Sequence, residues 1–233
     1  MLNVRIAAGC AVAAVIPLFR SWQLRWGATR EEATGALPGD EILPRADVTA
    51  TRAVAIDAPA DRVWPWIAQL GQGRGGLYSY DWLENLVGCD IHSADRVVPQ
   101  WQRIEVGDEI KLHPDVSLIV LSVQPGRILV VRNEVPTGST PPPYDFTWAF
   151  VLRHAPGGGT RLLVRERYRH VRRWAPLLVE PICVVSFVMS RRMLRGIRSR
   201  AEQSAPARSH DVRDLGLSSP DEPRTTVEPI QQR

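Results

Sequence analysis

Two segments near the C-terminal end of the sequence alternate between apolar and polar residues, and they constrain the fold most. The glycine-rich stretch 156–159 separates residues 145–153 from residues 160–170. Successive side chains of a β-strand point to opposite faces of a sheet, so the two alternations predict an antiparallel hairpin with one covered face. The first strand places four large apolar residues on that face: Phe146, Trp148, Phe150 and Leu152.

The two faces of the second strand of this hairpin differ in charge. Glu166 shares its face with Leu162, Val164, Tyr168 and His170. The opposite face carries Arg161, Arg165, Arg167 and Arg169, and we expect these arginines to face water. Glu166 then lies on the covered face, where a carboxylate needs a partner or a raised pKa.

The other periodic segments complete an α+β pattern. Alternation predicts further strands at residues 51–57, 109–113, 117–123 and 128–133. Helical spacing predicts one short helix from 58 to Gly71, a second at 80–86, and a long final helix at 174–202. The apolar stripe expected to cover the sheet consists of Leu178, Ile182, Val185, Met189, Met193 and Ile197.

Composition favours one folded domain flanked by extensions. With 233 residues, 44% of them hydrophobic, the chain can bury one core of ordinary size. We assign residues 51–202 to that domain, 27–50 to a linker, and the polar residues 203–233 to a disordered tail. The three cysteines lie far apart and the histidines show no ligand spacing, so we expect a reducing compartment, no metal and no cofactor.

Residues 1–26 form an apolar N-terminal segment. Its apolar run, residues 6–19, spans about 21 Å as a helix, which is short of the roughly 30 Å hydrocarbon core of a membrane. The arginines and tryptophans that follow suit an interfacial anchor that keeps the main domain cytoplasmic. The alternative is a helix packed on the domain.

The strand-into-helix entry resembles that of a known superfamily. Residues 53–67, AVAIDAPADRVWPWI, the strand start at 106–108 and the long terminal helix are similar to those of the SRPBCC superfamily, the START-related helix-grip proteins that include polyketide cyclase/dehydrase-like proteins. Residues 73–84 resemble a stretch of uncharacterised bacterial members. Over residues 51–202, the resemblance implies a curved antiparallel sheet wrapped around the C-terminal helix, with an apolar cavity between them.

Several aromatic and acidic residues lie on elements expected near that cavity. We expect the ligand-binding residues to be Tyr78, Tyr80, Trp82, Glu84, Trp148, Phe150, Glu166 and Tyr168. The alternative is a filled core that uses the same aromatics for packing. For catalysis the candidate acid or base is Glu166, followed by Glu84, Asp81 and His92.

Two further motifs have simpler explanations. Residues 71–76 fit G-x-G-x-x-G, but a helix precedes them and no βαβ unit surrounds them, so we interpret them as a turn. Residues 161–200 hold eleven arginines against Glu166 and Glu180, a basic region that either meets an anionic membrane surface or closes a solvated helix end. We expect no nucleic-acid partner.

The sequence therefore predicts a domain that binds a small hydrophobic or amphipathic molecule, either a lipid or a polyketide-like compound. The alternative is a cyclase, dehydrase or hydrolase that uses the same cavity with Glu166 as acid or base.

Overall fold

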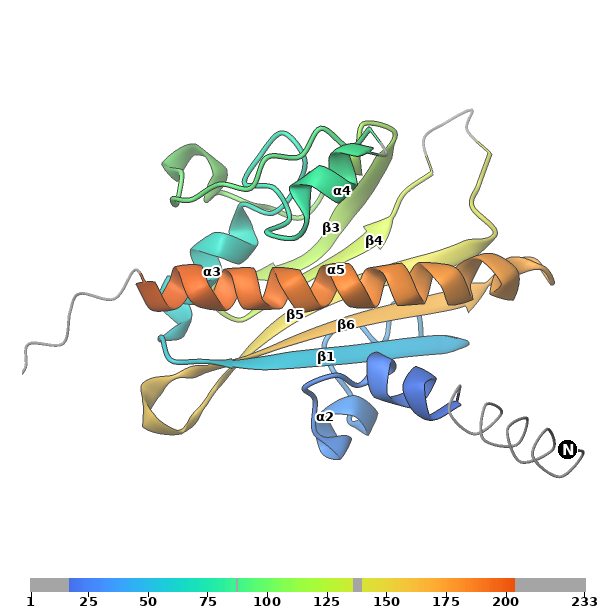
Figure 1. Ribbon diagram of the computed structural model, residues 1–233, viewed down its shortest axis with the longest axis horizontal. Helices are drawn as coiled ribbons and strands as arrows, with labels where there is room; N and C mark the ends of the chain where they lie inside the picture. The colour runs from blue at the N-terminus through green and yellow to red at the C-terminus, as the bar shows by residue number, and fades with distance from the viewer. Residues whose placement is uncertain (1–16, 87, 136–139, 204–233) are drawn as a thin grey trace, which may run out of the picture.

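A six-stranded antiparallel sheet and a long C-terminal helix dominate the computed structural model, which describes residues 17–86, 88–135 and 140–203 (Figure 1). The strand order is β1-β6-β5-β4-β3-β2. The strands are β1 (Val48–Ile56), β2 (Glu109–His113), β3 (Val116–Gln124), β4 (Ile128–Asn133), β5 (Tyr144–His154) and β6 (Thr160–His170). The helices are α2 (Arg30–Thr34), α3 (Ala60–Ala68), α4 (Asp81–Leu86) and α5 (Ala175–Gln203), with short 3-10 turns at Pro99–Trp101 and Pro156–Gly158. The predicted α+β fold, with a curved sheet against a long final helix and short helices after the first strand, is confirmed.

The predicted hairpin is β5 and β6. Trp148 lies opposite Glu166 and Phe150 lies opposite Val164 in this antiparallel pair. The connecting turn needs residues that tolerate a positive φ, and Gly157 supplies one at 77°. Because side chains alternate along each strand, this register places Phe150, Trp148 and Glu166 on the face of the sheet that α3 and α5 cover.

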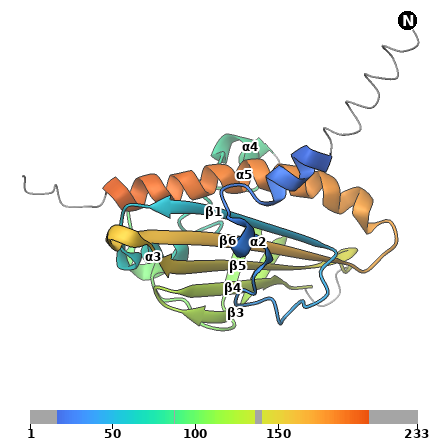
Figure 2. The same ribbon diagram turned by 90° about the horizontal axis from the view of Figure 1, so that it is seen from below.

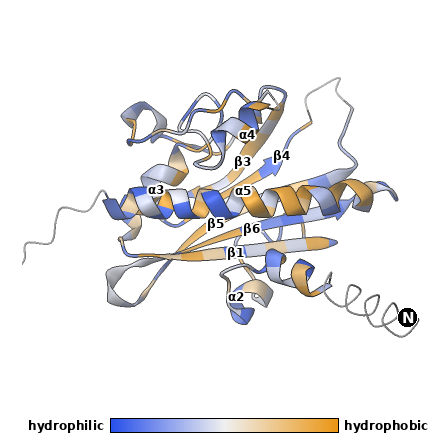
Figure 3. Cartoon of the chain, viewed as in Figure 1, coloured by the Kyte–Doolittle hydropathy of each residue, from blue (hydrophilic) through white to orange (hydrophobic). Residues whose placement is uncertain are grey.

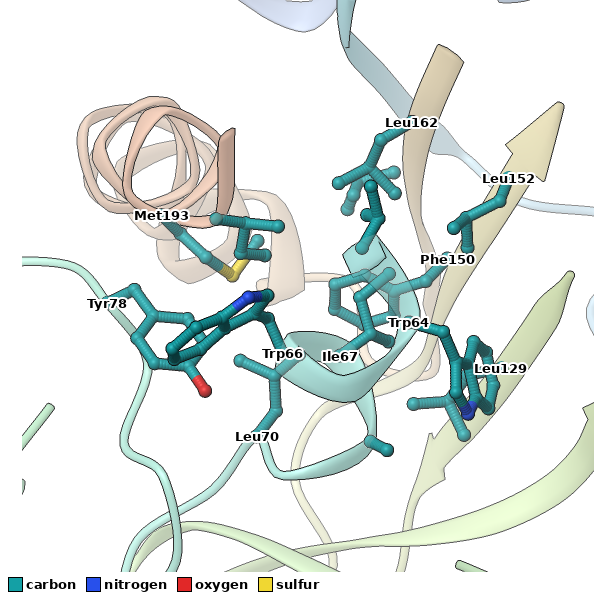
Figure 4. Packing of buried hydrophobic residues seen from close by; sticks show 14 of the residues in the cluster. Trp64, Trp66, Ile67, Leu70, Tyr78, Leu129, Phe150, Leu152, Leu162 and Met193 are labelled. Carbon is teal, nitrogen blue, oxygen red and sulfur yellow. The ribbon is translucent and has the colours of Figure 1, made fainter. Parts of the chain in front are cut away.

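The main core lies between this face, α3 and the C-terminal half of α5. Figure 4 shows Met193 of α5 near Trp66 of α3, with Phe150 and Leu162 of the sheet beyond them. Ile67, which the sequence places on the apolar face of its helix, is fully buried in the same cluster. This packing fixes the C-terminal half of α5 on the sheet.

The outer face of the sheet is covered over β1, β6 and β5 rather than open to water. Residues 27–47, expected as part of a connecting loop, lie along this face, and Leu37 packs against Val151 and Leu163 (Figure 2). The side chain of Arg165 is 2% exposed, and its Nη1 lies 2.6 Å from a carboxylate oxygen of Asp40.

The expectation that the β6 arginines face water is therefore wrong for Arg165. Its guanidinium also donates to the carbonyls of Glu32, Ala33 and Gly35, so the covering segment satisfies the charge that it buries. Burial lowers the pKa of Arg165, and Asp40 opposes that effect. Arg161 and Arg167 are also largely covered, whereas the side chain of Arg169 is half exposed.

Residues 17–24 are helical and pack against α5. Trp22 meets Phe187 edge to face with ring centroids 5.1 Å apart, and Arg20 forms an ion pair with Glu180 at 2.6 Å. Leu24 is buried, as expected for a helix packed on the domain. No helix in the described part of the chain has the length and apolarity needed to cross a membrane. The rest of the predicted anchor, residues 1–16, and the predicted disordered tail from residue 204 onward lie outside the described residues.

Candidate functional site

A cavity of about 890 Å³ lies between the sheet, α4 and the N-terminal half of α5. This volume is in the range of sites that hold a small molecule, roughly 300–1,000 Å³. Its walls are mostly apolar and include Leu112, Phe146, Trp148, Tyr168, Ile182 and Val185.

The predicted apolar stripe of α5 lies in two different environments. Met193 and Ile197 are buried in the core, but Leu178 is 39% exposed and Val185 is 58% exposed. In this half of the helix, Val179 and Cys183 pack against β1 and β6. Each lies one position after a residue of the predicted stripe, Leu178 or Ile182. The expectation that the whole stripe covers the sheet is wrong, because its N-terminal part lines the cavity. Figure 3 shows that this half of α5 is also its more hydrophobic half.

The cavity collects half of the eight residues expected to bind a ligand. The four on its wall are Glu84, Trp148, Glu166 and Tyr168. Tyr78, Tyr80 and Trp82 instead line a second hollow of about 550 Å³, beside the C-terminal half of α5. Phe150 is 1% exposed and belongs to the core. That any of these residues binds a ligand stays a prediction.

Side chains that line the second hollow, and arginines at the basic end of α5, make contacts within the domain. Tyr78 packs edge to face on Trp66 at 5.8 Å. The guanidinium carbons of Arg191 and Arg195 each lie 5.5 Å from the centre of the Trp26 ring. Such contacts are attractive because the face of an aromatic ring is electron-rich. Part of the basic region therefore fastens α5 to the N-terminal segment.

Glu166 has the partner that its position requires. Arg52 of β1, which is 1% exposed, lies with Nη1 2.7 Å from Glu166 Oε1. Ser190 donates to Oε1 at 2.9 Å, Tyr168 donates to Oε2 at 3.2 Å, and Ser186 lies 2.6 Å from both oxygens. The carboxylate of Glu166 is thus ion-paired and accepts hydrogen bonds from four donors. These bonds use the lone pairs of its two oxygens.

The same network perturbs the tyrosine beside Glu166. Burial raises the pKa of Tyr168 well above its usual value, and the Glu166 charge adds to that effect. Tyr168 is therefore a neutral hydrogen-bond donor at physiological pH. Sequence reasoning missed Arg52, Ser186 and Ser190, because nothing local to β1 or α5 marks them as neighbours of a residue on β6.

Glu84 differs from Glu166 because none of the described residues is its hydrogen-bond partner. It is 4% exposed and lines the cavity, and neither carboxylate oxygen accepts a hydrogen bond from the residues that the structure describes. Burial, helped by the negative charge of Asp81, raises the pKa of Glu84 to about 7. The hydroxyl of Ser79 is near enough to lower that pKa in part, but it donates to the carbonyl of Met189 at 3.2 Å.

The neighbours of Glu84 on α4 bind the loop that follows this helix. Asp81 accepts hydrogen bonds from the backbone and hydroxyl of Ser93, at 2.7 and 2.6 Å. Asn85 exchanges two hydrogen bonds with the backbone of Ile91, at 2.9 and 2.6 Å. Asp81 and Asn85 thus hold the loop, and Glu84, between them on the helix, is left on the cavity wall.

Trp148 contributes a second unpartnered polar atom to this wall. Its Nε1 is buried and has no hydrogen-bond partner among the described residues. A buried donor or acceptor that lacks a partner costs about 1–3 kcal/mol, so Glu84 and Trp148 are wall residues whose hydrogen-bonding capacity is unmet among the described residues.

Comparisons with known proteins found similarity only to solved structures of low sequence identity. No protein-family profile matches the sequence, and no curated protein matches it either. Among solved structures, a hypothetical protein from Helicobacter pylori is 12% identical with a TM-score of 0.45, covering 71% of this chain and 95% of that one. Protein MLL2253 from Mesorhizobium loti is 14% identical with a TM-score of 0.41, covering 68% and 100%. DynU16, a protein of the dynemicin biosynthetic locus, is 14% identical with a TM-score of 0.37, covering 64% and 46%.

Proposed function

We propose that this chain is a helix-grip domain of the SRPBCC type that binds a small apolar or amphipathic molecule between its sheet and α5. The observation that carries the proposal is the 890 Å³ cavity, whose mostly apolar wall holds the unpartnered carboxyl of Glu84. An apolar molecule in this space would remove hydrophobic wall surface from water, at about 25 cal/mol per Å². A polar group on that molecule would satisfy Glu84.

Apolar residues of α5 that are not fully buried support the same proposal. Leu178, Val185 and the half-buried Ile182 line the cavity where a tightly packed helix would meet the sheet. Protein interiors are normally packed to near-crystalline density, so a wall of this kind needs a function other than packing. A lipid or a polyketide-like molecule has the apolar length to cover it.

Blocking the cavity from α5 tests the proposal with a matched control. Val185 and Met189 lie one helical turn apart and both line the cavity, so Val185→Trp/Met189→Trp adds two indole rings to it. Val184 and Val188, each 42% exposed, do not line it, so Val184→Trp/Val188→Trp makes a similar change on the outer side of α5.

A neutral probe whose fluorescence rises in apolar surroundings, N-phenyl-1-naphthylamine, provides the measurement. We expect saturable binding to the wild-type chain and to the control pair, and at least about tenfold weaker binding to the cavity pair, equal to about 1.4 kcal/mol. Equal binding to both pairs would place the probe outside the cavity. No saturable binding to the wild-type chain would remove the proposed function.

The enzyme alternative ranks second because the carboxylate of Glu166 is held by Arg52 and three hydroxyl groups. A general base needs a free lone pair within reach of the proton that it removes. If a substrate is found, unchanged turnover in Glu166→Gln would exclude Glu166 as that base.

A further inference from the structure

The charge of the cavity wall is opposite in sign to that of the chain. The whole sequence carries 29 basic and 25 acidic residues. The described residues that line the cavity include four carboxylates, Glu84, Asp115, Glu134 and Glu166, and no arginine, lysine or histidine. The lining of this cavity is therefore acidic although the chain as a whole is basic.

These four carboxylates are not equivalent. Glu166 is neutralised by Arg52 at 2.7 Å. Asp115 is exposed and lies 3.7 Å from the imidazole of His113, and Glu134 is exposed as well. Glu84 alone among them is buried and without a hydrogen-bond partner in the described part of the chain.

The surroundings of Glu84 favour a positive charge next to it. Asp81 acts on it from the same helix, and the thiol of Cys89 lies close by in the loop that follows. The residues of α5 that line the cavity are all uncharged, and among those of β5 and β6 only the paired Glu166 carries a charge. A cation brought by a ligand would meet negative potential from the exposed Asp115 and Glu134 inward to Glu84.

Aromatic rings that also line the cavity are compatible with an ammonium group. Tyr144, Phe146, Trp148 and Tyr168 all line the cavity from β5 and β6. The electron-rich face of an aromatic ring attracts a cation, and tryptophan does so most strongly. Carboxylate and aromatic groups without competing cations are the combination that recognises an ammonium group.

We propose that the cavity selects an amphipathic amine, with the ammonium group against the carboxylate of Glu84 and the apolar body along α5 and the aromatic wall. The inference rests on the proposed binding function and narrows its ligand class. A molecule of the same size that ends in a carboxylate would bring a like charge to an acidic wall, which opposes binding.

Three ten-carbon probes separate the ligand classes: decylamine, decanol and decanoate. Calorimetric titration at pH 7.5, with each probe below its micelle-forming concentration, gives three dissociation constants for the wild-type chain. We expect decylamine to bind about 10- to 100-fold more tightly than decanol, since a hydrogen bond to a charged group contributes about 1.5–3 kcal/mol. We expect decanoate to bind more weakly than decanol.

Two carboxylate-to-amide variants locate the effect. In Glu84→Gln, the preference for decylamine over decanol should fall to about threefold or less, while decanol itself binds nearly as it does to the wild-type chain. Glu134→Gln removes an exposed carboxylate from the same wall. It should change the preference only slightly, and by less at 0.5 M salt, because salt screens exposed charges.

The outcomes distinguish this inference from the proposed function. If decanol binds but decylamine has no advantage, or if Glu84→Gln keeps that advantage, the amine class is wrong and the binding function stands. If decanoate binds best, the charge argument is wrong. If none of the three probes binds the wild-type chain, both proposals fail together.

Discussion

Replacing Glu84 by glutamine should change how the stability of the ligand-free chain depends on pH. The carboxyl of Glu84 has a pKa of about 7 in the folded chain against an ordinary value of 4.5, because burial disfavours its charged form. Between these two values the carboxyl of the unfolded chain loses its proton while that of the folded chain keeps it. Stability is therefore lost as pH rises through this window, and the loss is complete above pH 7.

The size of the effect follows from the two pKa values. A pKa shift of one unit corresponds to about 1.36 kcal/mol. The shift of Glu84 therefore lowers the free energy of unfolding by about 3 kcal/mol at pH 8 and by about 1 kcal/mol at pH 5. Glutamine has nearly the same shape and does not ionise, so the free energy of unfolding of Glu84→Gln does not contain this pH-dependent loss. Its stability relative to the wild-type chain should rise by about 2 kcal/mol between pH 5 and pH 8.

Urea unfolding at both pH values, on protein refolded from urea and dialysed, measures this difference directly. Other titrating groups cancel because both proteins are compared at each pH. Glu134→Gln removes an exposed carboxylate from the same cavity wall and controls for the loss of one negative charge. A stability difference between Glu84→Gln and the wild-type chain that is the same at pH 5 and pH 8 would refute the reasoning, because it would mean that Glu84 titrates normally.

Two further predictions follow from the contacts around α5. Arg52→Met should cost about 3–5 kcal/mol in urea unfolding, because it leaves Glu166 buried without its ion partner, and Arg52→Met/Glu166→Leu should cost less than the sum of the two single changes. Strict additivity would contradict the ion pair. Binding to anionic vesicles through the basic end of α5 also stays a prediction, and it should weaken with salt and with the four serine substitutions at Arg191, Arg192, Arg195 and Arg198. Co-sedimentation that ignores both changes would exclude that surface.

Local periodicity was enough to predict the parts of the fold that depend on neighbours in sequence. The alternation of β6 predicts that Glu166 and Tyr168 share the covered face, because side-chain direction in a strand repeats every two residues. The observed strand, Thr160–His170, has the predicted bounds. The terminal helix was predicted to within a residue at each end, as Ala175–Gln203.

The features that sequence reasoning missed depend on contacts between distant segments. Arg165 is buried beside Asp40, which is far away in the sequence. The negative charge of Glu166 is compensated by Arg52, which belongs to another strand. Neither partner leaves a local signal.

At the candidate site, too, local sequence patterns predict some features, and contacts between distant segments determine the others. The stripe of α5 predicts an apolar surface, but periodicity alone cannot say whether that surface meets a sheet or an open cavity. Glu84 was among the predicted residues because it follows the loop near the expected entrance. Its lack of a partner is visible only once Asp81 and Asn85 are seen to bind the loop instead.

Native mass spectrometry of the gently purified chain tests the central claim most directly. We expect the wild-type chain to carry one small molecule per chain, either as purified or after decylamine is added. Val185→Trp/Met189→Trp should lose this molecule, and Val184→Trp/Val188→Trp should keep it. A wild-type chain that retains no small molecule, either as purified or with decylamine present, would contradict the claim that this cavity is a binding site.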